Sequence, residues 1–180
     1  MSNLKLDSFL NIPFGTSSEK VKNLLTEKAG CIFDEENSDL DNLLFNGIKF
    51  AGRETLLISL IFFDGKFCKA LVFIQPNLEA QTVSLYQEVK AEINNKYFVS
   101  KQDYETYIYP YEKNDGYTES AISTGKASFL CYWNFLNRSL VDNYISIEIN
   151  EYMNIIVSYE DGFLMNLFVQ RRKENDSLDY

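Results

Sequence analysis

Residues 14–25 read Phe14-Gly15-Thr16-Ser17-Ser18-Glu19-Lys20-Val21-Lys22-Asn23-Leu24-Leu25, and this stretch predicts the start of an amphipathic helix. Gly15 permits a sharp turn into the helix. Thr16, followed three residues later by Glu19, fits a capping box, in which each side chain bonds a free backbone N–H. Val21, Leu24 and Leu25 supply an apolar stripe, and the glycine of Lys28-Ala29-Gly30 suits a helix end. We therefore expect a helix over about residues 17–29.

Two strongly apolar runs, residues 55–63 and 66–74, flank the dipeptide Asp64-Gly65. Asp-Gly between such runs favours a type I′ turn, because both central residues need positive φ. Nearly every position of the two runs is apolar, which is typical of strands that are covered on both faces. We expect a hairpin over about residues 55–75, near the middle of a sheet.

The remaining sequence predicts a second helix and further strands. Apolar residues recur at helical spacing over about residues 78–97. Strands are expected over about residues 104–159, where Ile145, Ile147 and Ile149 alternate with polar residues, as in a strand that buries one face. A short C-terminal helix is expected at about residues 162–173, with basic residues in its last turn, and a flexible loop at residues 114–125.

These elements predict an α+β fold in a single domain, residues 1–180. Its centre is an antiparallel β-sheet with the two main helices packed on one face and the short helix at the C-terminus. Hydrophobic residues make up 46% of the chain, which is enough for a packed core at this length.

The chain is acidic, with a net charge of -9. We expect no nucleic-acid partner, because that interaction needs cations that neutralise phosphates. We also expect no membrane insertion, because the longest apolar run, residues 56–63, is far too short to span a bilayer. The expected partner is another protein, and a basic one would be attracted by the negative charge. The oligomeric state stays open.

The cysteines and the start of the chain bear on its location. Cys31, Cys68 and Cys131 are odd in number and widely spaced, so they predict no disulfide framework, although a single Cys31–Cys68 bridge stays open. The first residues lack the charged and apolar regions of a signal peptide. We expect a cytoplasmic location for the chain as given, with the bacterial envelope or secretion as the alternative if a leader has been removed.

The sequence contains no histidine, which removes histidine-based nucleophile systems and histidine metal sites. The acidic residues 34–41 do not follow the spacing of a calcium loop and lack its turn glycine. We therefore predict no catalytic residue, no cofactor and no metal site. Carboxylate pairs depend on the fold for their separation, and they leave an enzyme with a cleft beside the sheet as an alternative.

Tyrosines are concentrated in one segment, at Tyr107, Tyr109 and Tyr111, with Tyr117 beyond them. In an extended strand the first three lie on one face at intervals of about 7 Å. Tyrosine offers a large contact area, few rotatable bonds and one hydroxyl, and Pro110 is typical of an edge strand or a strand end. These four tyrosines form the candidate binding surface. The alternative is an ordinary edge strand whose half-buried tyrosines cover the sheet.

The residues Phe14-Gly15-Thr16-Ser17-Ser18-Glu19-Lys20-Val21, followed by Leu24-Leu25, resemble the G-M-T-x-x-x-V-x-x-L-L helix start of the β-lactamase-inhibitor-protein-like fold. Small outer-membrane assembly lipoproteins share that motif, and Asp64-Gly65-Lys66-Phe67 is similar to their F-x-N-G-K-L meander. Uncharacterised bacterial domains of the same general build have features similar to Ile12-Pro13-Phe14-Gly15-Thr16-Ser17, Phe50-Ala51-Gly52-Arg53 and Ile156-Val157-Ser158-Tyr159-Glu160-Asp161. The resemblance covers about a third of the chain, which has Thr16-Ser17 where the family has Met-Thr and no lipid-attachment cysteine near its start. It implies a helix-on-antiparallel-sheet fold and protein binding rather than catalysis.

The sequence thus predicts a non-catalytic protein-binding module, such as an inhibitor, an immunity-type partner or an envelope accessory. The alternative is a small ligand-binding protein or a carboxylate-based enzyme.

Overall fold

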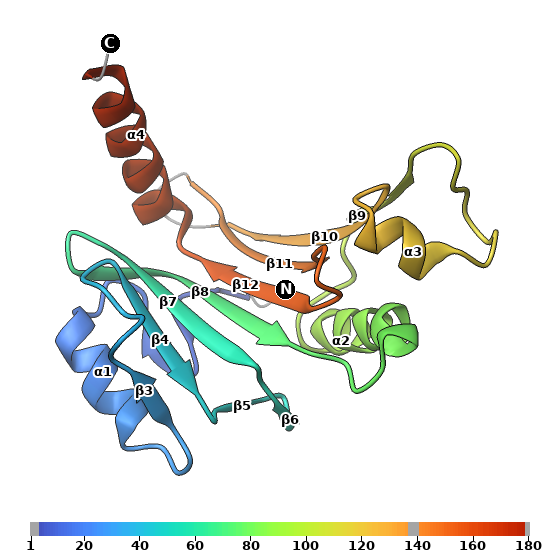
Figure 1. Ribbon diagram of the computed structural model, residues 1–180. Helices are drawn as coiled ribbons and strands as arrows, with labels where there is room; N and C mark the ends of the chain where they lie inside the picture. The colour runs from blue at the N-terminus through green and yellow to red at the C-terminus, as the bar shows by residue number, and fades with distance from the viewer. Residues whose placement is uncertain (1–3, 137–140, 179–180) are drawn as a thin grey trace.

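The structure, a computed structural model, describes residues 4–136 and 141–178 (Figure 1). Its centre is an eight-stranded sheet, counted over these residues, in which every neighbouring pair of strands is antiparallel. In spatial order the strands are β3 (Ile32–Asp34), β4 (Asn42–Asn46), β7 (Leu57–Phe63), β8 (Lys66–Ile74), β12 (Ile155–Glu160), β11 (Asn143–Ile149), β10 (Ala127–Phe135) and β9 (Gln102–Tyr107). The predicted α+β class with an antiparallel sheet is confirmed.

Helices and two short hairpins complete the described part of the chain. The helical elements are α1 (Ser18–Thr26), the single turn η1 (Glu79–Gln81), α2 (Thr82–Lys96), α3 (Thr118–Ser123) and α4 (Gly162–Leu178). The hairpins are β1 (Ser8–Phe9) with β2 (Ile12–Pro13), and β5 (Lys49–Phe50) with β6 (Arg53–Glu54). Two expectations differ from this: α3 occupies the segment expected to be a loop, and α4 extends to Leu178, beyond the expected short helix.

The sheet consists of two halves with the same order of main elements. The first half runs α1, β3, β4, β7, β8, and the second runs α2, β9, β10, β11, β12. The last strands of the two halves, β8 and β12, pair at the centre of the sheet, where Val72 faces Val157. A helix followed by four antiparallel strands is therefore repeated, and the two copies are joined edge to edge.

The core lies between the sheet and helices α1 and α2, which Figure 1 shows on the same side of the sheet. Val21 and Leu25 of α1 and Tyr86, Val89 and Ile93 of α2 are buried in one cluster with inward-facing strand residues. Burial alternates along β10 and β11, so every second side chain of these strands turns away from the core. The sheet therefore has a helix-covered face and a face without α1 and α2, which we call the open face.

The predicted β7–β8 hairpin is confirmed. Phe63 pairs with Lys66, and Asp64 and Gly65 both have positive φ, at 49° and 68°, as a type I′ turn requires. A β-bulge between Ile61 and Phe62 shifts the register near the turn.

The predicted capping box at the start of α1 is wrong. The cap position is held by Ser17, no side chain bonds a backbone N–H there, and the Thr16 hydroxyl donates instead to the carbonyl of Pro13 at 2.7 Å. The reason is that the segment before α1 pairs with β8. The Gly15 N–H donates to the Phe67 carbonyl at 2.7 Å, and the Phe67 N–H donates to the Thr16 carbonyl at 2.8 Å.

Helix α4 begins directly after β12 and rises on the open-face side of the sheet (Figure 1). The Gly162 N–H donates to Asn143 Oδ1 at 2.9 Å, and a Cβ at Gly162 would collide with the carbonyl of Asp142. Farther along, Phe168 packs edge-on against Phe63, with ring centroids 6.3 Å apart. The guanidinium of Arg171 binds the carboxylate of Asp64 in the β7–β8 turn.

Candidate functional site

The four candidate tyrosines do not form a row in the structure. Strand β9 ends at Tyr107, and a turn follows at Tyr109-Pro110, so Tyr109 and Tyr111 do not continue the strand. Tyr109 is 86% exposed, and Tyr117 is an exposed residue at the start of α3. The expectation of one extended face is therefore wrong, while the role of these residues in binding stays a prediction.

Tyr107 has the most contacts of this group and lies on the helix-covered side of β9. Its ring packs edge-on against Phe129 with centroids 6.3 Å apart, and its hydroxyl donates to Glu105 Oε1 at 3.0 Å. Partial burial raises the pKa of Tyr107, so the hydroxyl keeps its proton at neutral pH. This is the half-buried edge-strand tyrosine of the alternative interpretation.

The open face carries outward side chains in rows that cross the strands. The first row, which we call the apolar row, consists of Leu57, Phe73, Ile156, Glu148, Leu130 and Tyr104. The second consists of Leu44, Ser59, Leu71, Ser158, Ser146, Tyr132 and Gln102. The third consists of Ile61, Lys69, Glu160, Tyr144 and Asn134. Most of the apolar members are half-buried, so they offer contact area without belonging to the core.

A hollow of about 410 Å³ lies where the second and third rows meet, and we call it the sheet-face hollow. It is lined by Gln102, Tyr132, Asn134, Tyr144, Ser146, Ser158 and Glu160. The lining thus combines two aromatic rings, two serine hydroxyls, two amides and one carboxylate. The Glu160 carboxylate is paired through Oε2 with the Lys69 ammonium at 3.0 Å.

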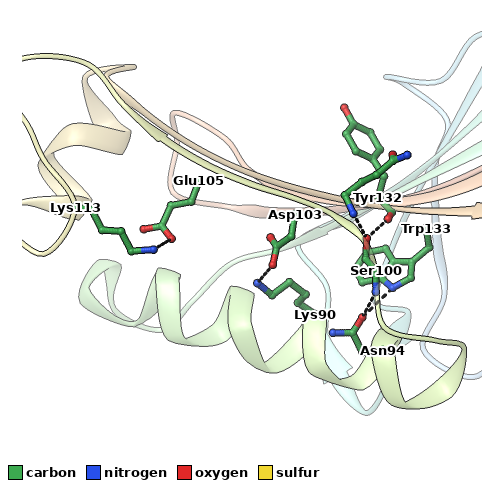
Figure 2. Close-up of polar contacts among 9 residues, drawn as sticks. Lys90, Asn94, Ser100, Asp103, Glu105, Lys113, Tyr132 and Trp133 are labelled. Carbon is green, nitrogen blue, oxygen red and sulfur yellow. Dashed lines mark hydrogen bonds and ion pairs between the residues drawn. The ribbon is translucent and has the colours of Figure 1, made fainter.

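The outer wall of the hollow is held by a polar network between α2, β9 and β10 (Figure 2). The Ser100 hydroxyl donates to the backbone carbonyl of Tyr132 and accepts the Gln102 N–H at 2.9 Å. Asn94 Oδ1 on α2 accepts both the Ser100 N–H and the Trp133 indole N–H, each at 3.0 Å. Ser100 therefore fixes the backbone at two residues of the hollow, Gln102 and Tyr132.

Two ion pairs continue this network along the edge strand, as Figure 2 also shows. Lys90 of α2 binds Asp103 at 2.7 Å, and Lys113 binds Glu105 at 2.6 Å. Both carboxylates are on the side of β9 that faces α2. The Lys90–Asp103 pair links the edge strand to α2, and the Lys113–Glu105 pair links it to the segment that follows β9, although ion pairs near the surface contribute little stability each.

The charged groups near the tyrosines of the hollow are acidic. Burial raises the pKa of Tyr132, and Glu148 and Glu160 raise it further. Burial likewise raises the pKa of Tyr144, with Asp142 and Glu160 adding to the effect. Both phenols are therefore protonated and neutral at physiological pH, and the local field is negative.

Several carboxyl groups elsewhere have displaced pKa values, and each of these is lowered. The Arg171 guanidinium lowers the pKa of Asp64, the Arg53 guanidinium lowers that of Glu92, and backbone N–H groups lower that of Asp115. A general acid at neutral pH needs a shift in the opposite direction. Within the described ranges, no group of three or more cysteine, aspartate or glutamate side chains is placed to hold a metal ion.

The three cysteines are free thiols, so the structure does not contain the Cys31–Cys68 bridge that the sequence left open. Burial raises the pKa of Cys68 to about 12, followed in effect by the negative charge of Glu160. This thiol is therefore protonated and a poor nucleophile at neutral pH.

Sequence reasoning missed the sheet-face hollow. The alternation of Ser146 and Glu148 with buried isoleucines identifies outward positions of one strand. The convergence of Tyr132, Tyr144 and Glu160 depends on the pairing of β10 with β11 and of β11 with β12. A single sequence gives neither the order nor the register of these strands, so no signal in it could have located the hollow.

Comparison with known proteins gives no family assignment: no protein-family model, curated protein or solved structure matches the chain. Among the described helices, none is long and apolar enough to cross a membrane.

Proposed function

We propose that this protein is a non-catalytic protein-binding module that contacts its partner through the open face of the sheet. The observation that carries the proposal is the apolar row on that face. Its members Leu57, Phe73, Leu130 and Ile156 are half-buried, and Tyr104 is 51% exposed. Glu148 interrupts the row between Ile156 and Leu130, and exposed apolar groups with polar groups among them are typical of protein interaction sites.

The difference between the helix-covered face and the open face of the sheet supports this proposal. Helices α1 and α2 would back the sheet and keep it rigid, while the open face stays available to a partner. A rigid surface loses little conformational entropy on binding, which favours affinity. The family that the sequence resembles also implies protein binding on a helix-and-sheet fold.

Charge supports a basic partner. The chain has a net charge of -9, and the open face carries the carboxylates Glu148 and Glu160 against the single paired ammonium of Lys69 among the row members named above. A negative surface attracts a positive one over distance and raises the rate of association.

The alternative is a small ligand-binding protein or a carboxylate-based enzyme that uses the sheet-face hollow. The hollow has room for a small ligand and several polar groups that could orient one. The hollow is lined by one carboxylate, that of Glu160, which is paired with Lys69, so its lining does not supply the pair of carboxyl groups that a carboxylate-based enzyme uses. We therefore prefer the protein-binding function.

The test is affinity capture from the native source with three forms of the protein. One form is wild type, and a second carries Tyr104→Glu and Leu130→Glu in the apolar row. The third carries the matched charges Gln87→Glu and Ala91→Glu, two exposed positions of α2 on the other side of the sheet. We expect the wild type and the α2 variant to retain the same protein and the open-face variant to lose it.

Retention of the same partner by the open-face variant would contradict the proposal. Circular dichroism and urea unfolding show whether each variant is folded. If the double variant unfolds, Tyr104→Ser repeats the test at an exposed position of the same row.

A further inference from the structure

The sheet-face hollow contains acceptors that lack donors. Asn134 Oδ1 is buried and has no hydrogen-bond partner among the residues that the structure describes. The Glu160 carboxylate is paired with Lys69 through Oε2, and a carboxylate can accept several further hydrogen bonds. Asn134 Oδ1 is closed to solvent, so the Glu160 carboxylate is the acceptor in the lining that a ligand with N–H groups can reach.

Two aromatic rings stand beside these acceptors. Tyr132 pairs with Ser146 across the ladder and Tyr144 pairs with Asn134, so the two tyrosines are diagonal neighbours on the same face. Diagonal neighbours are about 7–8 Å apart, which is within reach of large side chains. Both rings stay neutral at physiological pH, and the face of a tyrosine ring attracts cations.

The charges around the hollow favour a positive ligand over a negative one. Glu148 and Glu160 act on Tyr132, and Asp142 and Glu160 act on Tyr144. The ammonium of Lys69 is held in its ion pair with Glu160. A phosphate or carboxylate would be repelled by these groups and would bring no N–H donor to the Glu160 carboxylate.

A guanidinium group meets these requirements together. It is planar and permanently charged, carries five N–H donors and no acceptor, and stacks on aromatic rings. An ammonium has fewer donors and holds its water more tightly, so it fits less well. We propose that the sheet-face hollow is an anchor pocket for one arginine side chain of a protein partner. This proposal rests on the proposed function and names the chemistry by which the open face recognises its partner.

The probe is the peptide acetyl-Gly-Arg-Gly-amide, titrated into ¹⁵N-labelled full-length protein and followed by amide chemical shifts. One side chain supports only weak binding, with a Kd of about 1 mM or above. The control peptide contains citrulline in place of arginine, which keeps the shape and removes the charge. We expect the arginine peptide to shift amides of β10, β11 and β12 around the hollow and the citrulline peptide to bind about tenfold more weakly.

Three variants assign the interaction to the hollow. Glu160→Gln keeps the size of the side chain and removes its charge, and it should weaken arginine-peptide binding by about tenfold. Lys69→Met removes the resident cation and should strengthen binding by about threefold. Glu151→Gln makes the same charge change in the exposed β11–β12 turn, at the other end of β12 from Glu160, and should leave the affinity unchanged.

Equal binding of the two peptides, shifts outside the hollow, or unchanged affinity in Glu160→Gln would each overturn the proposal. Absence of any arginine-peptide binding at tens of millimolar would overturn it too. These failures are distinct from failure of the proposed function. If Tyr104→Glu with Leu130→Glu abolishes capture of the partner while Glu160→Gln does not, the open face binds the partner and the arginine pocket does not exist.

Discussion

Replacing Asn94 by alanine tests the polar network behind the hollow. Asn94 Oδ1 accepts two hydrogen bonds, from the Ser100 N–H and from the Trp133 indole N–H. Trp133 is fully buried, and its N–H also reaches the Phe98 carbonyl at 3.0 Å, so it keeps one acceptor in the variant. The Ser100 N–H loses its side-chain acceptor.

The magnitude follows from these contacts. The Ser100 bond contributes about 1 kcal/mol and the shared Trp133 bond somewhat less, which gives a loss of roughly 1.5–2 kcal/mol. Position 94 lies in α2, where alanine is favoured over asparagine by about 0.5 kcal/mol, and this offsets part of the loss. We expect Asn94→Ala to lower the free energy of unfolding by about 1–1.5 kcal/mol.

Urea unfolding measures the change in the free energy of unfolding, and the protein contains an intrinsic fluorescent probe. Trp133 is the single tryptophan, so its fluorescence reports on this site while circular dichroism reports on the whole fold. Asn94→Asp is the matched control, because its carboxylate still accepts both hydrogen bonds, and it should unfold within about 0.5 kcal/mol of wild type. If Asn94→Ala unfolds at the wild-type urea concentration, the network does not stabilise this edge and the reasoning is refuted.

Two further predictions concern the helix α2. The Tyr86 hydroxyl is buried without a hydrogen-bond partner among the described residues, so Tyr86→Phe should raise the free energy of unfolding by about 1 kcal/mol. Urea unfolding measures this change. A lower free energy of unfolding in the variant would show that the hydroxyl forms a hydrogen bond in the folded protein. The guanidinium of Arg53 donates two hydrogen bonds to the Glu92 carboxylate, at 2.7 and 2.6 Å, and lowers the pKa of Glu92 in the folded state. The stability that this pair contributes is therefore present above the pKa of Glu92 in the unfolded chain. It is lost as the pH falls through the lowered pKa of the folded state. Arg53→Gln should therefore unfold more easily than wild type at pH 7, by up to about 1 kcal/mol, and the gap should narrow as the pH is lowered below the ordinary pKa of a glutamate side chain; a constant gap would contradict the linkage.

Local sequence rules succeeded where neighbouring residues decide the structure. Asp64-Gly65 specifies its turn because both residues must adopt positive φ, whatever the rest of the chain does. The capping box failed because Thr16 and Phe67 bond to each other through their backbones, and their pairing is a tertiary contact that capping statistics do not contain. The prediction of a row of tyrosines is wrong for a related reason. The pairing of β9 with β10 ends at Tyr107, which pairs with Ala127.

The candidate site could not be predicted from local sequence rules. Its residues come from β9, β10, β11 and β12, and the hollow exists only after these strands pair in their observed register. A shift of one residue in any of these ladders would turn side chains of one strand to the other face and separate the residues that line the hollow. The sequence could identify outward-facing positions but not which of them meet.

The pairing of β8 with β12 has a consequence for synthesis of the chain on the ribosome. Ile74 pairs with Ile155, so roughly 80 residues must be added after β8 before its second neighbour exists, which takes about 4–16 s at ordinary rates of translation. During that interval the apolar strand Lys66–Ile74 has one unpaired edge, the kind of edge that recruits other nascent chains. Lys69 lies near the middle of the strand and has not yet met Glu160, so its positive charge is then unpaired and opposes pairing between two copies of β8. We therefore expect the lysine of the mature ion pair to oppose aggregation of the unfinished protein as well.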